Sequence, residues 1–207
     1  TGITYSDETV RAFAALKPAA DDFRIFWDNA YAVHHLDEEV EILNILEEAK
    51  AAGREDMIFE FVSTSKITFA GAGISAVASS KANLCEIRDV MSKKTIGYDK
   101  INQLRHVKFF GDAKGVKAHM KKHAEIIRPK FELVLEVLER EMGGLGIGEW
   151  THPRGGYFIS FEALPGCAKK IVARCKEAGV TLTGAGATYP YKKDPGDSNI
   201  RIAPTYP

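Results

Sequence analysis

Residues 57–66 read Met57-Ile58-Phe59-Glu60-Phe61-Val62-Ser63-Thr64-Ser65-Lys66, and residues 69–73 continue as Phe69-Ala70-Gly71-Ala72-Gly73. The apolar run predicts a strand, and the small residues after Lys66 predict a turn beside it. Lys66 is therefore expected where a strand ends and the chain turns. That position suits a nucleophilic amine better than a solvated surface charge.

Strands and helices alternate through the first half of the chain, as the apolar patterns indicate. Strands are predicted at Phe23–Trp27, which we expect to be fully buried, at Met57–Val62 and at Ile74–Ala78. Helices are predicted from Ser6 to Lys17, from Leu43 to Ala52 and from Ala82 to Met91. This order predicts an α/β layer with a mainly parallel sheet, which we assign to residues 1–112.

The second half has a different pattern. One long helix is predicted from Ala113 to Met142, with a kink or break at Pro129, and the glycine-rich residues 143–148 end it. A strand at Tyr157–Phe161, a helix at Cys167–Ala178 and a strand at Ile200–Ala203 follow. We expect residues 113–207 to form a smaller α+β domain that is incomplete in this chain.

The composition excludes several classes of protein. The chain has 207 residues, 45% of them hydrophobic, and its 28 basic and 28 acidic residues cancel. This balance gives no basis for nucleic acid or an anionic membrane as a partner. No stretch reaches the length of a transmembrane helix. Three cysteines without metal-type spacing favour a cytoplasmic protein.

A pair of histidines has a spacing that can bind metal. His119 and His123 are one helical turn apart, but no acid or cysteine at a matching spacing completes a site. We therefore predict no metal site and expect these histidines on a solvated helix face.

Three side chains near predicted strand ends form a set with a shared chemical use. Lys66 can form a Schiff base with an aldehyde when its amine is deprotonated, which a desolvated site favours. Asp28 follows the strand at Phe23–Trp27 and can keep a pyridine ring protonated, which makes the ring an electron sink. Tyr31 can donate a hydrogen bond to an oxygen on that ring. Pyridoxal phosphate chemistry uses these groups.

The same three residues have structural interpretations. Lys66 can be a surface lysine at a strand end, Asp28 a turn or helix N-cap residue, and Tyr31 a half-buried tyrosine at the rim of the core.

Three further residues have binding roles to weigh. Ser63 and Ser65 can hydrogen-bond a phosphate, helped by turn amides. Arg201 can bind a substrate carboxylate with its bidentate fork. Its structural interpretation is an ion pair with Asp194 or Asp197.

Five short motifs occur in register along the whole chain. They are Thr1-Gly2, Asp28-Asn29-Ala30-Tyr31, Ser63-Thr64-Ser65-Lys66, Gly155-Gly156-Tyr157-Phe158 and Asn199-Ile200-Arg201-Ile202. In this order they resemble the end of Asn-Pro-Thr-Gly, then Asp-x-Ala-Tyr, Ser-x-Ser-Lys, Gly-Gly-x-Phe and Asn-x-Arg-Leu/Ile of the fold type I, class I/II pyridoxal-phosphate-dependent aminotransferases. The chain resembles the C-terminal half of these enzymes, and its ending, residues 200–207, looks most like a divergent aspartate aminotransferase branch.

The resemblance implies a role for each of six side chains. Lys66 is expected to form the Schiff base and then to move the proton between the substrate Cα and the cofactor. Asp28 is expected to pair with the pyridine nitrogen and Tyr31 with the 3′-oxygen of the cofactor. Ser63 and Ser65 are expected to bind its phosphate, and Arg201 the substrate α-carboxylate. The cofactor implied is pyridoxal 5′-phosphate.

Two features depart from the family. Most relatives place an arginine that binds phosphate eight residues after the lysine, where this chain has Ile74. Phosphate binding is then expected to use serines, backbone amides or another chain. Family members are also roughly twice as long, so we expect a fragment that need not be active alone.

The function implied by the resemblance is transamination of L-aspartate with 2-oxoglutarate, in a homodimer with small-molecule substrates. Other amino donors and acceptors stay open. An alternative from another class is the aminotransferase-like, effector-sensing domain of a transcriptional regulator. The neutral charge leans against a nucleic acid partner for this chain.

Overall fold

The structure is a computed structural model, and it describes residues 3–205. Two compact units make up the chain. The first unit contains Tyr5–Val33 and Glu41–Met120, and the second contains, among the described residues, 3–4, 34–40 and 121–205. The domain boundary expected between residues 112 and 113 stays a prediction.

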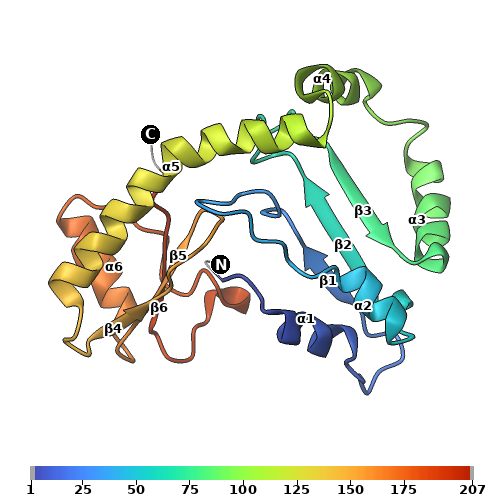
Figure 1. Cartoon of the computed structure of the whole chain (residues 1–207). Coiled ribbons are helices and arrows are strands. Elements are labelled where there is room, and N and C mark those ends of the chain that lie inside the picture. Colours follow the sequence, from blue (N-terminus) through green and yellow to red (C-terminus); the bar gives the residue numbers. More distant parts are fainter. Residues whose placement is uncertain (1–2, 206–207) are drawn as a thin grey trace. The chain divides into compact units, whose positions relative to one another are not determined.

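The first unit is built on a three-stranded sheet with the order β1-β2-β3 (Figure 1). Its strands are β1 (Ile25–Asp28), β2 (Ile58–Ser63) and β3 (Ser75–Ser79). β1 runs parallel to β2, and β3 runs antiparallel to β2. The α/β fold class is confirmed. Parallel pairing does not predominate among these three strands, because β3 follows β2 through a loop too short for a parallel crossover.

Two helices supply most of the core of the first unit. They are α1 (Asp7–Ala14), capped by Ser6, and α2 (Ile45–Ala51), capped by Asn44. Their apolar faces pack with the 3-10 turn η1 (Glu55–Met57) and the start of β2. The buried members are Val10, Ala14, Ile45, Ala49, Met57 and Ile58.

The prediction that β1 is fully buried is wrong for this chain. Exposure alternates along the strand, and Phe26 is 72% exposed. Trp27 points to the other face, where its ring contacts Tyr5 and Phe13. Phe26 contacts the edge of Phe59 on β2, with ring centroids 5.7 Å apart. One face of the sheet is therefore covered by α1 and α2, and the aromatic face around Phe26 is open.

Helix α3 (Lys81–Lys94) is close to its prediction, whereas α4 (Lys100–Phe110) was not predicted. Asp99 caps α4, and Gly111, with φ 73°, ends it. The residues that α4 buries are polar, Asn102 and His106, while Ile101 and Leu104 point outward. A helix with a polar buried face has no amphipathic signal of the usual kind, which explains the missed element.

The second unit combines a long helix with an antiparallel sheet. Helix α5 (Ala113–Met142) has the predicted bounds and supplies residues to both units. It continues through Pro129, which is exposed, so the predicted break is absent. The sheet pairs β4 (Gly148–Trp150) with β5 (Ile159–Ala163), and β5 with β6 (Asn199–Ile202).

The core of the second unit lies between this sheet and its helices (Figure 1). Ala168 of α6 (Ala168–Glu177) packs with one group of strand side chains, and Phe131 of α5 packs with another. A short 3-10 turn, η2 (Pro190–Lys192), precedes β6. Among residues 3–205, no helix is both long and apolar enough to cross a membrane.

Candidate active site

The carboxyl ends of β1 and β2 lie at one edge of the first sheet, because the two strands are parallel. Asp28 ends β1 opposite Phe61, and Ser63 ends β2 two residues later. The backbone N–H of Asn29 donates to the carbonyl of Phe61 over 2.8 Å, and the Asn29 side chain donates to Glu60 Oε1 over 2.8 Å. These bonds fix the segment that leads from Asp28 to Tyr31.

Lys66 and Tyr31 come together at this edge. The Lys66 Nζ lies over the Tyr31 ring, 5.0 Å from its centroid. Tyr31 belongs to the turn after β1, and Lys66 to the turn after β2. Tyr31 is half-buried, whereas Lys66 is exposed. The desolvation expected around the lysine is therefore not supplied by the residues that the structure describes.

Asp28 has the turn interaction that its structural interpretation predicts. Its Oδ1 accepts a hydrogen bond from the Ala30 N–H over 3.2 Å. The residue is nevertheless exposed at the strand end, so a carboxylate is presented at the same edge as Lys66 and Ser63. A bond from one oxygen to a turn amide leaves lone pairs on the carboxylate for another partner.

The loop that contains Lys66 is closed at its base by backbone bonds. Thr64 N–H donates to the Ile74 carbonyl over 2.9 Å, and Ile74 N–H donates to Thr64 Oγ1 over 2.8 Å. Gly73 lies against Ser65, and a Cβ on Gly73 would be 3.0 Å from the Ser65 nitrogen. The backbone of Ile74, the residue at which the family resemblance led us to expect an arginine, thus closes this loop.

Three side chains that contact this loop were missed or misread from the sequence. Asn102 Nδ2 donates to the Ala72 carbonyl over 2.8 Å, and His106 Nε2 lies 2.8 Å from Thr64 Oγ1. His119 Nε2 lies 3.0 Å from the Ile67 carbonyl, so the expectation that His119 is solvated is wrong. Their spacing of four residues places Asn102 and His106 on one face of a helix, but nothing in the sequence marks that face as buried.

Arg201 belongs to the second unit, on β6 opposite Ser160 of β5. Its guanidinium carbon lies over the Phe158 ring, 4.5 Å from the centroid. Its Nε is buried and has no hydrogen-bond partner among the described residues. A buried N–H donor without a partner is costly, so this atom points to an anionic ligand that would accept from it.

The ion pair proposed as the structural role of Arg201 does not form within residues 3–205. Asp194 accepts backbone N–H groups of Ser198 and Asn199, both over 2.8 Å. These bonds, with that from Asn199 foremost, hold the pKa of Asp194 below its ordinary value. Asp197 lies 3.9 Å from Lys169 Nζ. Both aspartates thus have other partners, and the Arg201 guanidinium remains available.

The Gly155-Gly156 pair of the fourth motif is explained by a close backbone approach. Gly156 N–H donates to the carbonyl of His34 over 2.8 Å, and a Cβ on Gly155 would lie 2.5 Å from that carbonyl oxygen. Phe158 follows two residues after Gly156, and its ring contacts the Arg201 guanidinium. The first motif, Thr1-Gly2, and the last two residues of the chain lie outside the described residues.

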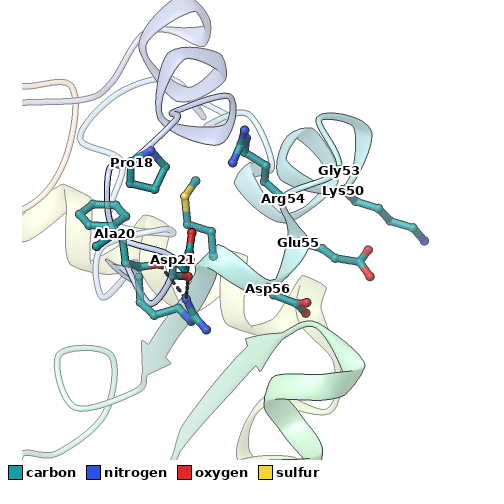
Figure 2. A pocket seen from close by; sticks show the side chains of 11 residues that line it. Pro18, Ala20, Asp21, Lys50, Gly53, Arg54, Glu55 and Asp56 are labelled. Carbon is teal, nitrogen blue, oxygen red and sulfur yellow. Dashed lines mark hydrogen bonds between the residues drawn. The ribbon is translucent and has the colours of Figure 1, made fainter.

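A pocket of about 720 Å³ lies at the opposite edge of the first sheet, beside the amino ends of β1 and β2 (Figure 2). Its rim mixes Lys50 and Arg54 with Glu55 and Asp56, and Arg24 donates to nearby backbone carbonyls. The mixed charge favours no ligand class. In the part of the chain that is described, no group of three or more metal-ligating side chains comes together.

Comparison with known proteins agrees with the five motifs. The sequence profile described as "Aspartate amino-transferase" matches residues 1–207. A protein from Mycolicibacterium smegmatis named as an aminotransferase is 53% identical over this whole chain, which covers 49% of that protein. An aspartate aminotransferase from Corynebacterium glutamicum is 46% identical over the whole chain, which covers 48% of it.

The fold agrees as well. The crystal structure of an aspartate transaminase from Corynebacterium glutamicum superposes with a TM-score of 0.95 at 46% identity, covering 100% of this chain and 49% of that one. The chain thus spans about half the length of the relatives it matches. It belongs to the aspartate aminotransferase family, and it corresponds to the C-terminal half of those relatives.

Proposed function

We propose that the whole protein transfers an amino group from an amino acid to a 2-oxo acid, with L-aspartate and 2-oxoglutarate as the pair and pyridoxal phosphate as the cofactor. The approach of Lys66 to Tyr31, at the strand edge that also presents Asp28, is the observation that carries this proposal. A nucleophilic amine, a phenol and a carboxylate at one edge match what this cofactor needs from its protein.

The side chains of this edge fit the groups of the cofactor. Pyridoxal phosphate supplies an aldehyde for covalent attachment and a ring that withdraws electrons from the substrate Cα. Lys66 would hold the cofactor through its amine and would move the proton at the substrate Cα. Asp28 holds a proton on the ring nitrogen, and Tyr31 donates to the ring oxygen. Ser63 and Ser65 donate to the phosphate.

Arg201 is assigned to the substrate α-carboxylate. Its unpartnered Nε and its terminal nitrogens form a fork that matches a carboxylate, and the Phe158 ring supports the guanidinium plane. Lys66 is exposed in this chain, so the closed environment that activates the amine would come from protein outside it. A homodimeric state and a cytoplasmic location belong to the same proposal.

The test uses the full-length protein with added pyridoxal phosphate. We expect borohydride to fix the cofactor on Lys66, as found by peptide mass spectrometry, and we expect L-aspartate to discharge the bound cofactor's visible absorbance. Lys66→Ala should lose the adduct. Lys50→Ala, an exposed lysine at the other sheet edge, should keep it.

Two results would contradict the proposal. If no adduct forms on Lys66 of the wild type, the assigned chemistry is wrong. If the adduct forms but no common amino acid discharges it, transamination is wrong, and an effector-sensing role for the bound cofactor takes its place.

A further inference from the structure

We propose that His106 of α4 is a positioning residue for Lys66: through Thr64, it locks the loop of residues 64–74 and so holds the lysine amine in place beside Tyr31. This inference rests on the proposed function of Lys66. The lock itself is a property of the chain without cofactor and can be measured there.

The Thr64 hydroxyl connects the groups that hold the loop. It accepts the N–H of Ile74 over 2.8 Å, at the far end of the loop. His106 Nε2 lies 2.8 Å away on its other side. Thr64 lies between Ser63 and Ser65, two residues before the lysine. One hydroxyl thus joins the start of the loop, its end and a helix.

The Asn102 carbonyl sets the direction of the hydrogen bond between His106 and Thr64. His106 Nδ1 lies 2.8 Å from the carbonyl oxygen of Asn102, which can only accept, so Nδ1 has the proton. In the neutral ring Nε2 then accepts, and Thr64 Oγ1–H donates to it. Thr68 Oγ1 is 3.3 Å from the same nitrogen and 3.1 Å from the Thr64 carbonyl. Each polar atom of this group therefore has a role consistent with the others.

Two neighbouring side chains, Asn102 and His119, hold the rest of the loop through three hydrogen bonds. Asn102, one turn before His106 on α4, donates to the carbonyls of Ala72 and Gly73 over 2.8 and 3.2 Å. His119 of α5 contacts the carbonyl of Ile67, the residue after Lys66, over 3.0 Å. Two helices that follow the loop in the sequence thus hold both sides of the lysine.

The burial of these groups gives the lock its strength. His106 is 8% exposed and Asn102 is 9% exposed. Removing the imidazole takes away the partner that lies 2.8 Å from the part-buried Thr64 hydroxyl, and leaving such a group without its partner costs more than an average hydrogen bond contributes. Lys66 is two residues from Thr64, so a shift of the loop backbone at Thr64 would carry the lysine amine away from the Tyr31 ring.

The first experiment measures hydrogen exchange in the full-length protein without cofactor. His106→Leu and Thr64→Val should speed the exchange of the Ile74 amide about tenfold, the effect of losing one buried hydrogen bond. Thr64→Ser keeps the hydroxyl and should stay near wild type. Gln103→Leu is the matched control, because Gln103 is exposed on the same helix.

The second experiment examines the loaded enzyme. His106→Leu should lower kcat for L-aspartate about tenfold with little change in KM, because Lys66 would be displaced as the proton-transferring group. The kinetic isotope effect with Cα-deuterated L-aspartate should rise in this variant. His106→Gln, whose amide can reach Thr64, should recover part of kcat.

The outcomes separate this inference from the proposed function. Unchanged Ile74 exchange in both His106→Leu and Thr64→Val would overturn the lock. Faster exchange with unchanged kcat and isotope effect would overturn the positioning role. Faster exchange of amides throughout the first unit would mean general destabilisation and would also overturn the lock. If the wild type forms no adduct on Lys66, the proposed function fails. The exchange rate of the Ile74 amide in the variants then still tests whether His106 holds the loop.

Discussion

The replacement of Arg201 tests the most specific contact that the structure offers to a substrate. Arg201→Lys keeps a positive charge but removes the planar fork, the Nε donor and the contact with the Phe158 ring. Arg201→Gln removes the charge as well. The buried position of Nε means that water does not replace the lost carboxylate contact easily.

The size of the effect follows from the bonds that are lost. A bidentate guanidinium–carboxylate pair comprises two charge-assisted hydrogen bonds of about 1.5–3 kcal/mol each. Losing both in Arg201→Gln should therefore weaken binding by about 3–6 kcal/mol, or about 100-fold to 10,000-fold. Arg201→Lys keeps one bond and the charge, so a loss of about 10-fold to 100-fold is expected.

The assay is a spectrophotometric titration of the loaded full-length protein with L-aspartate, combined with steady-state kcat/KM. Arg174→Gln is the control, because Arg174 is exposed on α6 and forms a surface ion pair with Glu177. Binding by Arg201→Gln within about twofold of wild type would refute the reasoning, because a carboxylate contact of this strength cannot be lost without a measurable change. An equal loss in Arg174→Gln would point to a general disturbance of the second unit.

Three further changes have outcomes that the structure sets. Gly73→Ala would place a Cβ 3.0 Å from the Ser65 nitrogen, so the lysine loop should shift and cofactor binding should weaken, as measured by the dissociation constant of the cofactor. Phe131→Ala, at a core position that is 1% exposed, should destabilise the protein by about 3–5 kcal/mol in urea unfolding, and a loss under about 1 kcal/mol would contradict the packing. The lowered pKa of Asp194 means that its stabilising effect is present above the ordinary carboxyl pKa and is lost as the pH falls through the lower folded value. The difference in unfolding free energy between wild type and Asp194→Asn should therefore shrink between neutral pH and about pH 3, and a constant difference would contradict this account.

The sequence determined the elements whose signals are local. The long helix was predicted with the bounds Ala113–Met142 that it has, and the glycine-rich residues after it marked its end. The strands that lead to Asp28 and to Lys66 were also predicted, since short apolar runs bounded by turn residues are typical of strands. The same runs placed both residues at strand ends, where the structure has them.

Tertiary structure decided the features that depend on distant partners. Three features depend on which face of an element another element covers, and no local pattern encodes this. They are the exposure of Phe26, the antiparallel pairing of β3 with β2, and the burial of Asn102 and His106. The same holds for His119, which reads as a solvated residue but contacts the carbonyl of Ile67, 52 residues away in the chain. Groups that are 30 to 52 residues apart meet only when the fold brings their elements together. The lysine could therefore be found from the sequence, whereas the side chains that hold its loop could be found only from the tertiary structure.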